Sequence, residues 1–441
     1  MTAFLLAVLL AAAEASPPPS PEAAADPDLE EEVASVARRV EILRGLRFRQ
    51  VPSTLRLPED AHRARLLAEA GPIPEERLAA RGRAWADLGF GDPRGPAELD
   101  ARLRRDLEGV SVDPSGRTLR AEPWVLPEED LTPKPGEEAA ASTLLLTTGV
   151  RPDGPPLAHA LTHALERQAG EGAPSDDSTD ALLAARAWSE GEANLVAIRY
   201  LFEAMGLEDE ILAHRVDLGE IAGGRLLPAA SASAPVPVPA LLSFVYEDGF
   251  AQAVDWHRRG GFRALATAMG TRRTTRDVMH PERSVPPPRI AGEQVRFVPS
   301  GFRIADEDRL GEQGIVALVS AGTGKDNLGL LAGDGWSWDT LLRLEPEKGG
   351  PGATSWRTEW KDASEAAEFA DAYRRVVDAR EASPLTPVEA APGRWVLRTG
   401  GRVVRVEQQG TAVWVFVAPE AVDAALQPPA KPKTEPKPPR R

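Results

Sequence analysis

The spacing of apolar residues predicts helices over most of the chain. Val33, Val36, Val40 and Leu43 recur at helical intervals, so residues 30–46 are expected to form an amphipathic helix. Residues 58–88 and 96–107 are predicted to be helical as well. A further helix is expected over 157–168, where Pro155-Pro156 precede the apolar pattern as helix-starting residues.

The helix after it is expected to begin near Ser178, Thr179 or Asp180, each of which can cap a helix start. It should end near Met205, since Gly206 suits the position just past a helix.

Shorter alternating segments predict strands. Residues 110–121 alternate around a turn sequence, Asp113-Pro114-Ser115-Gly116, and are expected to form a hairpin. Residues 142–147 are a plausible strand. Within 394–417, three apolar runs are separated by Gly400-Gly401 and Gln409-Gly410, which predicts an antiparallel meander. The sequence leaves open whether this meander is an edge of the main domain or a separate docking element. The fold class expected is therefore α+β and mostly helical.

Composition narrows the function classes. The chain has 441 residues with 52 basic and 67 acidic side chains, a net charge of −15, and 42% hydrophobic residues, which is enough for a packed core. An acidic chain matches a phosphate backbone poorly, so no nucleic-acid partner is expected. No cysteine is present, which excludes disulfides and thiolate metal sites. A metal must therefore be held by carboxylates and by some of only six histidines.

The two ends of the chain differ from the body. Residues 4–13 are apolar but too short to span a bilayer, which takes about 20 residues, and a small-x-small pattern at 13–15 follows. This predicts a signal peptide over 1–15 and an exported protein, periplasmic or secreted, without a transmembrane segment; a buried N-terminal helix is the alternative. Residues 16–29 read as a Pro/Ala-rich linker, and 421–441 as a disordered, basic, proline-rich tail.

Candidate chemistry is concentrated on the two helices after residue 154. His159 and His163 are four residues apart and share one helix face, opposite Leu157 and Leu161. Two imidazoles at this spacing can bind one divalent ion.

The two segments HALTHALERQ (159–168) and WSEGEANLVAIRYL (188–201) together resemble gluzincin-type zinc metallopeptidases. The resemblance implies a zincin-like fold and a Zn²⁺ ion held by His159, His163 and Glu190. Segments 243–254, 276–283 and 333–336 resemble a bacterial branch of such proteins, so the resemblance covers roughly residues 33–379. Glu192 is the other candidate for the third ligand, but it lies about 160° around the helix from Glu190.

One position departs from the family pattern. The residue after the first histidine is Ala160, where the family has a glutamate. In zinc hydrolases of this type that glutamate is the general base, which takes a proton from the attacking water and passes it to the leaving amine. Loss of a positioned base costs roughly two to four orders of magnitude in rate. The resemblance therefore implies an inactive pseudo-peptidase.

Other candidates are weaker. Glu166 could substitute as the base only for a substrate that enters from an unusual direction, and a surface position is expected for it. Tyr246 and His280 are candidates for stabilising an oxyanion, because the family places polar groups in these segments. The run SAGTGK (320–325) does not satisfy the phosphate-binding loop pattern, because its first glycine is replaced by Val319.

Three functional hypotheses follow. The first is an exported pseudo-peptidase with a retained zinc site that binds a peptide or protein ligand in its old cleft. The second is a weakly active zinc peptidase, and the third is a metal-free envelope interaction protein. The expected organisation is a zincin-like domain over 30–285 with a short sheet beside the paired helices, a helical lobe over 286–385 and a β-meander over 386–420. The oligomeric state is not indicated by the sequence.

Overall fold

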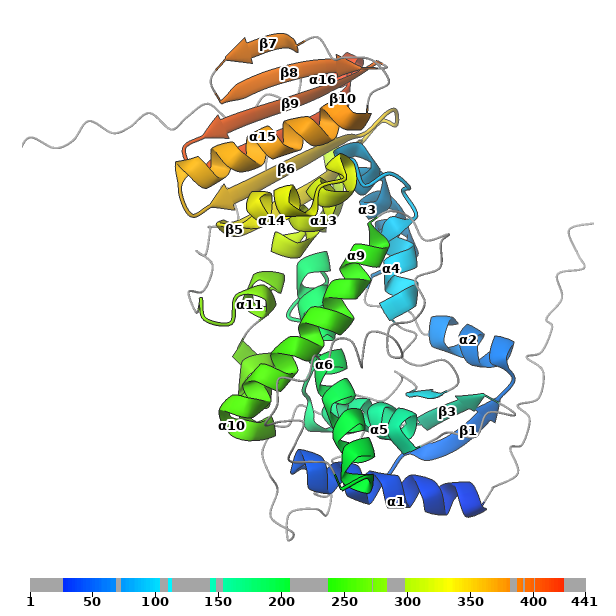
Figure 1. The fold of residues 1–441 in the computed structure, drawn as a ribbon. Helices are drawn as coiled ribbons and strands as arrows, with labels where there is room; N and C mark the ends of the chain where they lie inside the picture. Colours follow the sequence, from blue (N-terminus) through cyan, green and yellow to red (C-terminus); the bar gives the residue numbers. More distant parts are fainter. Residues whose placement is uncertain are drawn as a thin grey trace, which may run out of the picture.

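The computed structural model describes residues 27–68, 73–103, 110–112, 143–147, 154–206, 237–271, 273–283, 298–380, 387–391, 393–399 and 401–423. It is an α+β protein, mostly helical, as the sequence predicts. The molecule is elongated: a large sheet lies at one end, helix α1 and a small sheet lie at the other, and long helices run between them (Figure 1).

The helices of the first half follow the apolar spacing of the sequence. They are α1 (Pro27–Arg44), α2 (Glu59–Ala68), α3 (Glu75–Leu88), α4 (Gly95–Leu103), α5 (Gly154–Ala169) and α6 (Thr179–Ala204). The prediction over 58–88 is corrected to two helices, α2 and α3. Pro74 stands directly before α3 and lacks the amide hydrogen that a continuous helix would need.

A three-stranded sheet accompanies α5, as expected. Its strands are β1 (Ser53–Leu57), β2 (Val110–Val112) and β3 (Thr143–Thr147), in the order β1-β3-β2. β3 lies parallel to β1 and antiparallel to β2. The turn of the hairpin expected over 110–121 lies outside the described residues.

Helices α9 (Val238–Ser243), α10 (Gly249–Thr271) and α11 (Thr275–Met279) follow in the described part of the chain, with a π-helical turn, η2 (Phe244–Asp248), between α9 and α10. Gly260 and Gly261 have non-helical backbone angles, so α10 is kinked there. The η2–α10 segment packs along α6.

The C-terminal region is built on a seven-stranded antiparallel sheet, in the order β4-β5-β6-β10-β9-β8-β7. Its strands are β4 (Phe302–Asp308), β5 (Trp336–Pro346), β6 (Ala353–Trp360), β7 (Pro387–Ala391), β8 (Arg394–Thr399), β9 (Arg402–Gln409) and β10 (Ala412–Pro419). The helices are α13 (Gly311–Thr323), α14 (Asp326–Gly333), α15 (Ala363–Arg380) and α16 (Glu420–Asp423).

This region corrects the expected organisation. The sequence predicts a helical lobe over 286–385, but the described residues of this segment, 298–380, form three strands as well as three helices. The meander strands β8, β9 and β10 form as predicted, yet they continue the same sheet, because β10 pairs with β6. Sequence periodicity identifies a strand but not its long-range partner, so a local pattern could not show this continuity.

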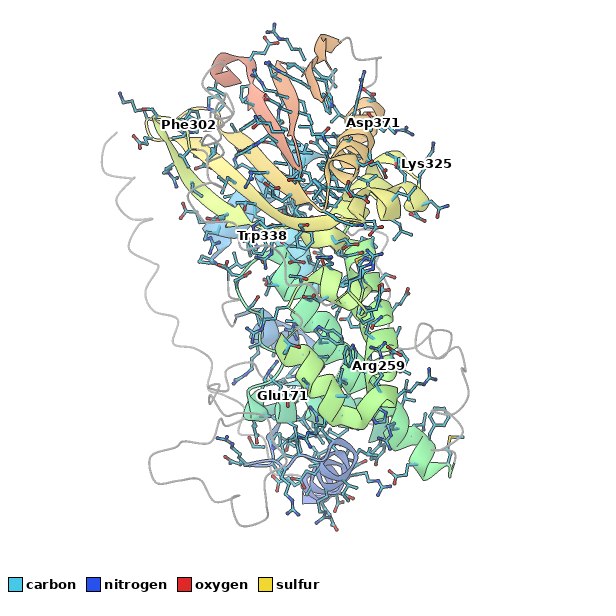
Figure 2. All side chains as sticks on the ribbon, turned by 90° about the vertical axis from the view of Figure 1, so that its left-hand side faces the viewer. Glu171, Arg259, Phe302, Lys325, Trp338 and Asp371 are labelled. Atoms are coloured by element: carbon cyan, nitrogen blue, oxygen red, sulfur yellow. The ribbon has the colours of Figure 1, made fainter. Side chains whose placement is uncertain are left out.

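Both faces of the central strand β10 are buried. Val413, Val415 and Val417 join the main core, whereas Trp414 and Phe416 join a smaller cluster on the opposite face. The main core is continuous from Leu29 in α1 to Val417 in β10. Trp338 lies where the sheet meets the helices, and Glu171 and Arg259 lie further along the helical part (Figure 2).

The structure describes only small parts of the two chain ends. The predicted signal peptide and most of the linker and the basic tail lie outside the described residues. Helix α1 already begins at Pro27, inside the expected linker, and α16 extends to Asp423, inside the expected tail. Among the described helices, none has the length and apolar character needed to cross a bilayer.

Candidate metal centre

Helix α5 presents the two histidines. Its residues from Leu157 to Glu166 are buried on every side, so the face that carries the imidazoles is covered as fully as the leucine face. His159 and His163 are each only 2% exposed. Gln168, the penultimate residue of α5, accepts hydrogen bonds from the backbone N–H groups of Arg49 and Gln50 and so attaches the loop before β1 to this helix.

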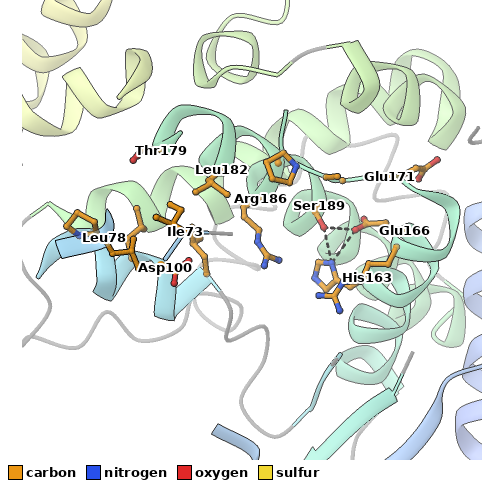
Figure 3. A pocket seen from close by; sticks show the side chains of 18 of the residues that line it. Ile73, Leu78, Asp100, His163, Glu166, Glu171, Thr179, Leu182, Arg186 and Ser189 are labelled. Atoms are coloured by element: carbon orange, nitrogen blue, oxygen red, sulfur yellow. Dashed lines mark hydrogen bonds and ion pairs between the residues drawn. The ribbon is translucent and has the colours of Figure 1, made fainter. Parts of the chain in front are cut away.

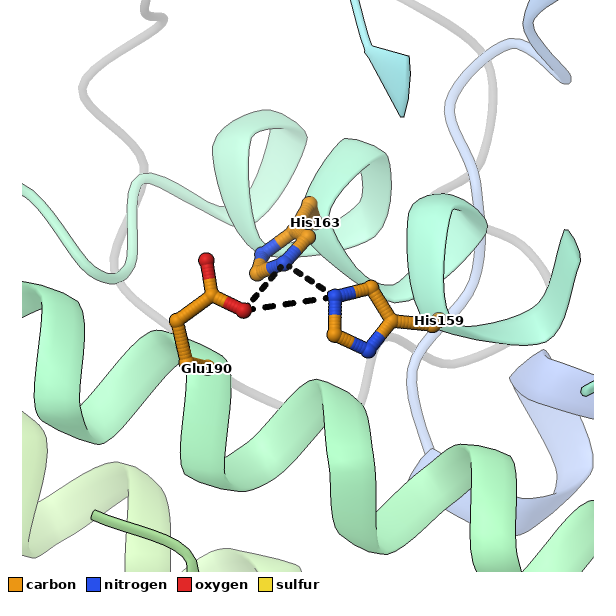
Figure 4. A group of neighbouring side chains, drawn as sticks. All are labelled: His159, His163 and Glu190. Carbon is orange, nitrogen blue, oxygen red and sulfur yellow. Dashed lines mark hydrogen bonds and ion pairs between the residues drawn. The ribbon is translucent and has the colours of Figure 1, made fainter. Parts of the chain in front are cut away.

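Helix α6 supplies the carboxylate. Ser178 caps its start by accepting a hydrogen bond from the Ala181 amide, and Gly206 follows its end with φ of 71°, both as the sequence predicts. α6 packs against α5. This places Glu190, 2% exposed, opposite the two histidines (Figure 4).

The three side chains converge on one point. His159 Nε2 lies 3.0 Å from His163 Nε2, and Glu190 Oε2 lies 3.3 Å and 3.6 Å from these two nitrogens. We call His159, His163 and Glu190 the His/His/Glu triad. The sequence grouping of these residues is therefore confirmed, and Glu190 rather than Glu192 faces the histidines.

The spacing of the triad fits a metal ion. Ligands about 2.0–2.1 Å from a tetrahedral zinc ion lie about 3.3 Å from one another. The circle through the three facing atoms of the triad has a radius of about 1.9 Å, so a point about 2.0–2.1 Å from all of them exists. Glu190 Oε2, which faces both imidazoles, has no hydrogen-bond partner among the described residues. A cation would satisfy this oxygen.

The electrostatics of Glu190 agree with this fit. Burial by itself would raise the pKa of the Glu190 carboxyl, but the neighbouring imidazoles His163 and His159 hold that pKa well below its ordinary value. Glu190 is therefore an anion beside Nε2–H groups, and a metal ion would take the place of the protons on these nitrogens.

The outer nitrogen of His163 is also held in place. Its Nδ1 lies 3.0 Å from Ser189 Oγ and 3.3 Å from Glu166 Oε2, and the Ser189 hydroxyl donates to the same Glu166 oxygen (Figure 3). An Nδ1–H group satisfies this arrangement. It leaves the lone pair of Nε2 directed into the triad, which is the tautomer that a metal-binding histidine requires.

This contact corrects the surface position expected for Glu166, which is only 3% exposed. It also argues against Glu166 as a substitute base. Glu166 binds Nδ1, and Nδ1 and Nε2 lie on different edges of the ring, so the imidazole of His163 separates Glu166 from the centre of the triad. The sequence signal for this role is the i, i+3 spacing of His163 and Glu166, which places the two side chains on neighbouring positions of one helix face.

Glu192 has a different partner. It is fully buried and forms an ion pair with Arg44, the last residue of α1, which also pairs with Glu171. Burial raises the pKa of Glu171, and the charge of Arg44 opposes that rise. The three residues attach α1 to the α5–α6 pair, and no sequence motif pointed to this contact.

The remaining sequence candidates lie in other surroundings. Ala160 is fully buried in the main core. Tyr246 is buried in η2, also as part of that core. His280 follows α11, and its Nε2 lies 2.6 Å from Glu312 Oε1, so the structure places it in a second cluster instead of beside the triad.

A cavity of about 440 Å³ opens beside His163. His163, Glu166, Ser189 and Arg186 line one end (Figure 3). At the other end Ile73, Leu78 and Leu182 lie together with the polar residues Asp100 and Thr179 (Figure 3). Leu99 and Leu103 also line the cavity. The described residues that line this cavity include neither His159 nor Glu190, so it reaches the outer edge of His163 and not the centre of the triad.

Comparison with known proteins gives one match. Residues 298–426 match a family described as a domain of unknown function, DUF8575. No curated protein and no solved structure matches the chain. The matched segment covers the seven-stranded sheet and its helices, while the triad and the cavity lie in the part of the chain before it.

Proposed function

We propose that this protein is an exported, zincin-like binding protein that retains a zinc site but lacks peptidase activity. The observation that carries the proposal is the convergence of His159, His163 and Glu190 on one buried point. Ala160, which follows His159 in the sequence, stands where the family has its general base. Zn²⁺ would be held by the two Nε2 atoms and by Glu190 Oε2, and it would supply Lewis acidity.

The residues around the site support binding more than catalysis. Hydrolysis needs a group that accepts a proton from water and delivers it to the leaving amine. Ala160 has no such group, and Glu166 is screened by the ring of His163. Weak residual activity is therefore a less favoured function.

The cavity is the place where a ligand would bind. It combines apolar side chains with polar groups, which include His163, Glu166 and Arg186, and its volume lies within the range of small-molecule pockets. An extended peptide with an apolar side chain next to a polar group fits this lining. The ligand would contact the ring of His163 at its outer edge.

The first experiment measures metal content. Wild-type protein prepared without chelator and dialysed against buffered Zn²⁺ is expected to bind zinc, and His159→Ala and Glu190→Gln are expected to lose that ion. If the wild type and both variants bind the same amount of zinc, the triad holds no zinc and this part of the proposal is overturned.

The second experiment tests for a missing base. Wild-type protein is expected to leave casein and a peptide library intact. EDTA-sensitive cleavage that appears in Ala160→Glu would show that only the base is missing. Ala160→Gln is the matched control, because it has nearly the same size but no base. Since Ala160 is enclosed by the core, circular dichroism must show that both variants fold. EDTA-sensitive cleavage by the wild type would overturn the pseudo-peptidase proposal.

A further inference from the structure

A second group of potential metal ligands lies at the junction between the helical part and the sheet region. His280, Glu312 and Asp334 each offer one ligand atom, and these atoms all lie within 4.8 Å of one another. We call these residues the junction cluster. His280 comes from the helical part, directly after α11, while Glu312 and Asp334 belong to the segment that matches DUF8575.

Local structure brings the three residues together. Glu312 lies in the first turn of α13, and Asp334 follows the last residue of α14. A Cβ atom at Gly333 would lie 2.7 Å from Val316 Cγ2 and 3.3 Å from Glu312 Cγ. The absence of a side chain at Gly333 therefore lets the end of α14 approach the start of α13, which places Asp334 beside Glu312.

Glu312 carries the main evidence for a ligand. Its side chain is only 2% exposed, and its Oε1 lies 2.6 Å from His280 Nε2. Its Oε2 is buried and has no hydrogen-bond partner among the described residues. The ion pair with His280 satisfies Oε1 of Glu312 but leaves Oε2 without a donor among the described residues. A buried carboxylate with an unsatisfied oxygen costs free energy.

Asp334 and His280 are partly exposed, so an ion could reach this cluster from solvent. Asp334 is 46% exposed, and its contacts with Arg283 and with the Gly335 amide both use Oδ1, so Oδ2 is available as a ligand. His280 is 19% exposed. One imidazole and two carboxylates suit a borderline divalent transition-metal ion.

We propose that His280, Glu312 and Asp334 form a second divalent metal site, distinct from the His/His/Glu triad, that binds an ion such as Zn²⁺. The ion joins the segment after α11 to the DUF8575 segment. The site does not depend on the proposed zinc at the triad, since the two clusters share no residue.

The test counts bound zinc by equilibrium dialysis and mass spectrometry. Two ions per wild-type chain are expected. Asp334→Asn, at a half-exposed position, and His280→Ala are each expected to retain one, whereas Glu282→Gln, on the rim of the cluster, retains two. Two ions in both Asp334→Asn and His280→Ala would overturn the proposal.

His159→Ala separates the two sites. That variant is expected to retain one ion, and addition of Zn²⁺ should raise its Tm. The double variant His159→Ala/His280→Ala should bind no zinc, and Zn²⁺ should not raise its Tm. If the wild type binds one ion that His159→Ala abolishes, the junction site is overturned and the triad stands. If the single ion is lost in His280→Ala instead, the junction site stands and the zinc of the proposed function is absent.

Discussion

At the scale of single residues, Glu166 shows how a side chain outside the triad orients a potential ligand. It accepts from the Ser189 hydroxyl and contacts Nδ1 of His163, so Nε2 of that ring is fixed toward His159 and Glu190. Carboxylates that hold the outer nitrogen of a metal-binding histidine commonly tune metal affinity. Glu166 is therefore expected to position His163 without touching the ion.

We expect Glu166→Gln to weaken zinc binding by about 10–100-fold, because an amide holds the Nδ1–H group less strongly than a carboxylate does. Competition with a chromophoric chelator at neutral pH measures this affinity. Glu368→Gln makes the same chemical change at an exposed position on α15 and should leave the affinity unchanged. Equal affinities for the two variants would contradict the role assigned to Glu166.

At the scale of secondary-structure elements, the crossing of α6 and the η2–α10 segment depends on two glycines. A Cβ atom at Gly191 would lie 2.2 Å from the Gly249 carbonyl oxygen, and one at Gly249 would lie 2.2 Å from the Ala187 carbonyl oxygen. Both contacts are with backbone, which cannot rotate away. The glycine that follows Glu190 thus has a packing role in addition to its place in the motif.

Gly191→Ala is expected to destabilise the fold by about 1–3 kcal/mol, because the overpacking at the crossing exceeds the helix preference of alanine. Zinc affinity should fall as well, since Glu190 is the preceding residue. Urea unfolding measures the first effect. Gly270→Ala, in α10 with no neighbour within 4 Å, should instead stabilise by up to about 1 kcal/mol, and a similar result for both variants would contradict this reading.

At the scale of the whole molecule, buried polar contacts join the DUF8575 segment to the helices before it. Asp308 of β4 accepts from the Thr179 amide at 2.7 Å and from the Thr179 hydroxyl at 2.9 Å, and it also pairs with Arg81 at 3.3 Å. Arg309 lies 2.9 Å from Asp180 and stacks over Trp338. The start of the helix that carries Glu190 is therefore held by the sheet region.

Asp308→Asn should lower the free energy of unfolding of the whole chain by about 2–4 kcal/mol. It removes a buried negative charge that pairs with Arg81 and accepts hydrogen bonds from Thr179 at the start of α6. Chemical denaturation followed by tryptophan fluorescence measures this loss. The control is Asp255→Asn, which breaks an exposed pair with Arg259 and should cost no more than about 1 kcal/mol. Two separate unfolding transitions in the wild type would show that the DUF8575 segment and the helices before it unfold independently, which would contradict this prediction.

Asp339 makes stability depend on pH. This carboxylate is fully buried and accepts N–H groups from Leu310, Gly311, Trp336 and Trp356. Burial raises its pKa to about 6, against 3.8 for an ordinary aspartate. Between these values the folded chain holds a proton that the unfolded chain lacks, so the contribution of Asp339 to stability falls as pH rises through this window.

The difference in unfolding free energy between wild type and Asp339→Asn should therefore fall by about 2.4 kcal/mol from pH 4 to pH 7, since each pKa unit corresponds to about 1.4 kcal/mol and the unfolded chain is already partly ionised at pH 4. Urea titrations of both proteins at four pH values give this difference. A difference that stays constant or grows with pH would contradict the raised pKa.

The sequence by itself determined the local features of this protein. Helix α5, helix α6 with its Ser178 cap and Gly206 end, and the grouping of His159, His163 and Glu190 were all predictable. The helices and their ends depend on spacing within one segment and on the chemistry of single positions, which a linear pattern records. The grouping of Glu190 with the two histidines came from the resemblance to a family motif. The alanine at position 160, where the family has a glutamate, can also be read directly from the sequence.

Tertiary structure alone decided which distant residues became neighbours. The pairing of β10 with β6, the contact of Arg44 with Glu192, and the approach of His280 to Glu312 join segments that are from 32 to 148 residues apart. Periodicity assigns a residue to a face but does not say what covers that face. Partners such as these are selected when the whole core packs, because only then does a buried charge find the group that compensates it.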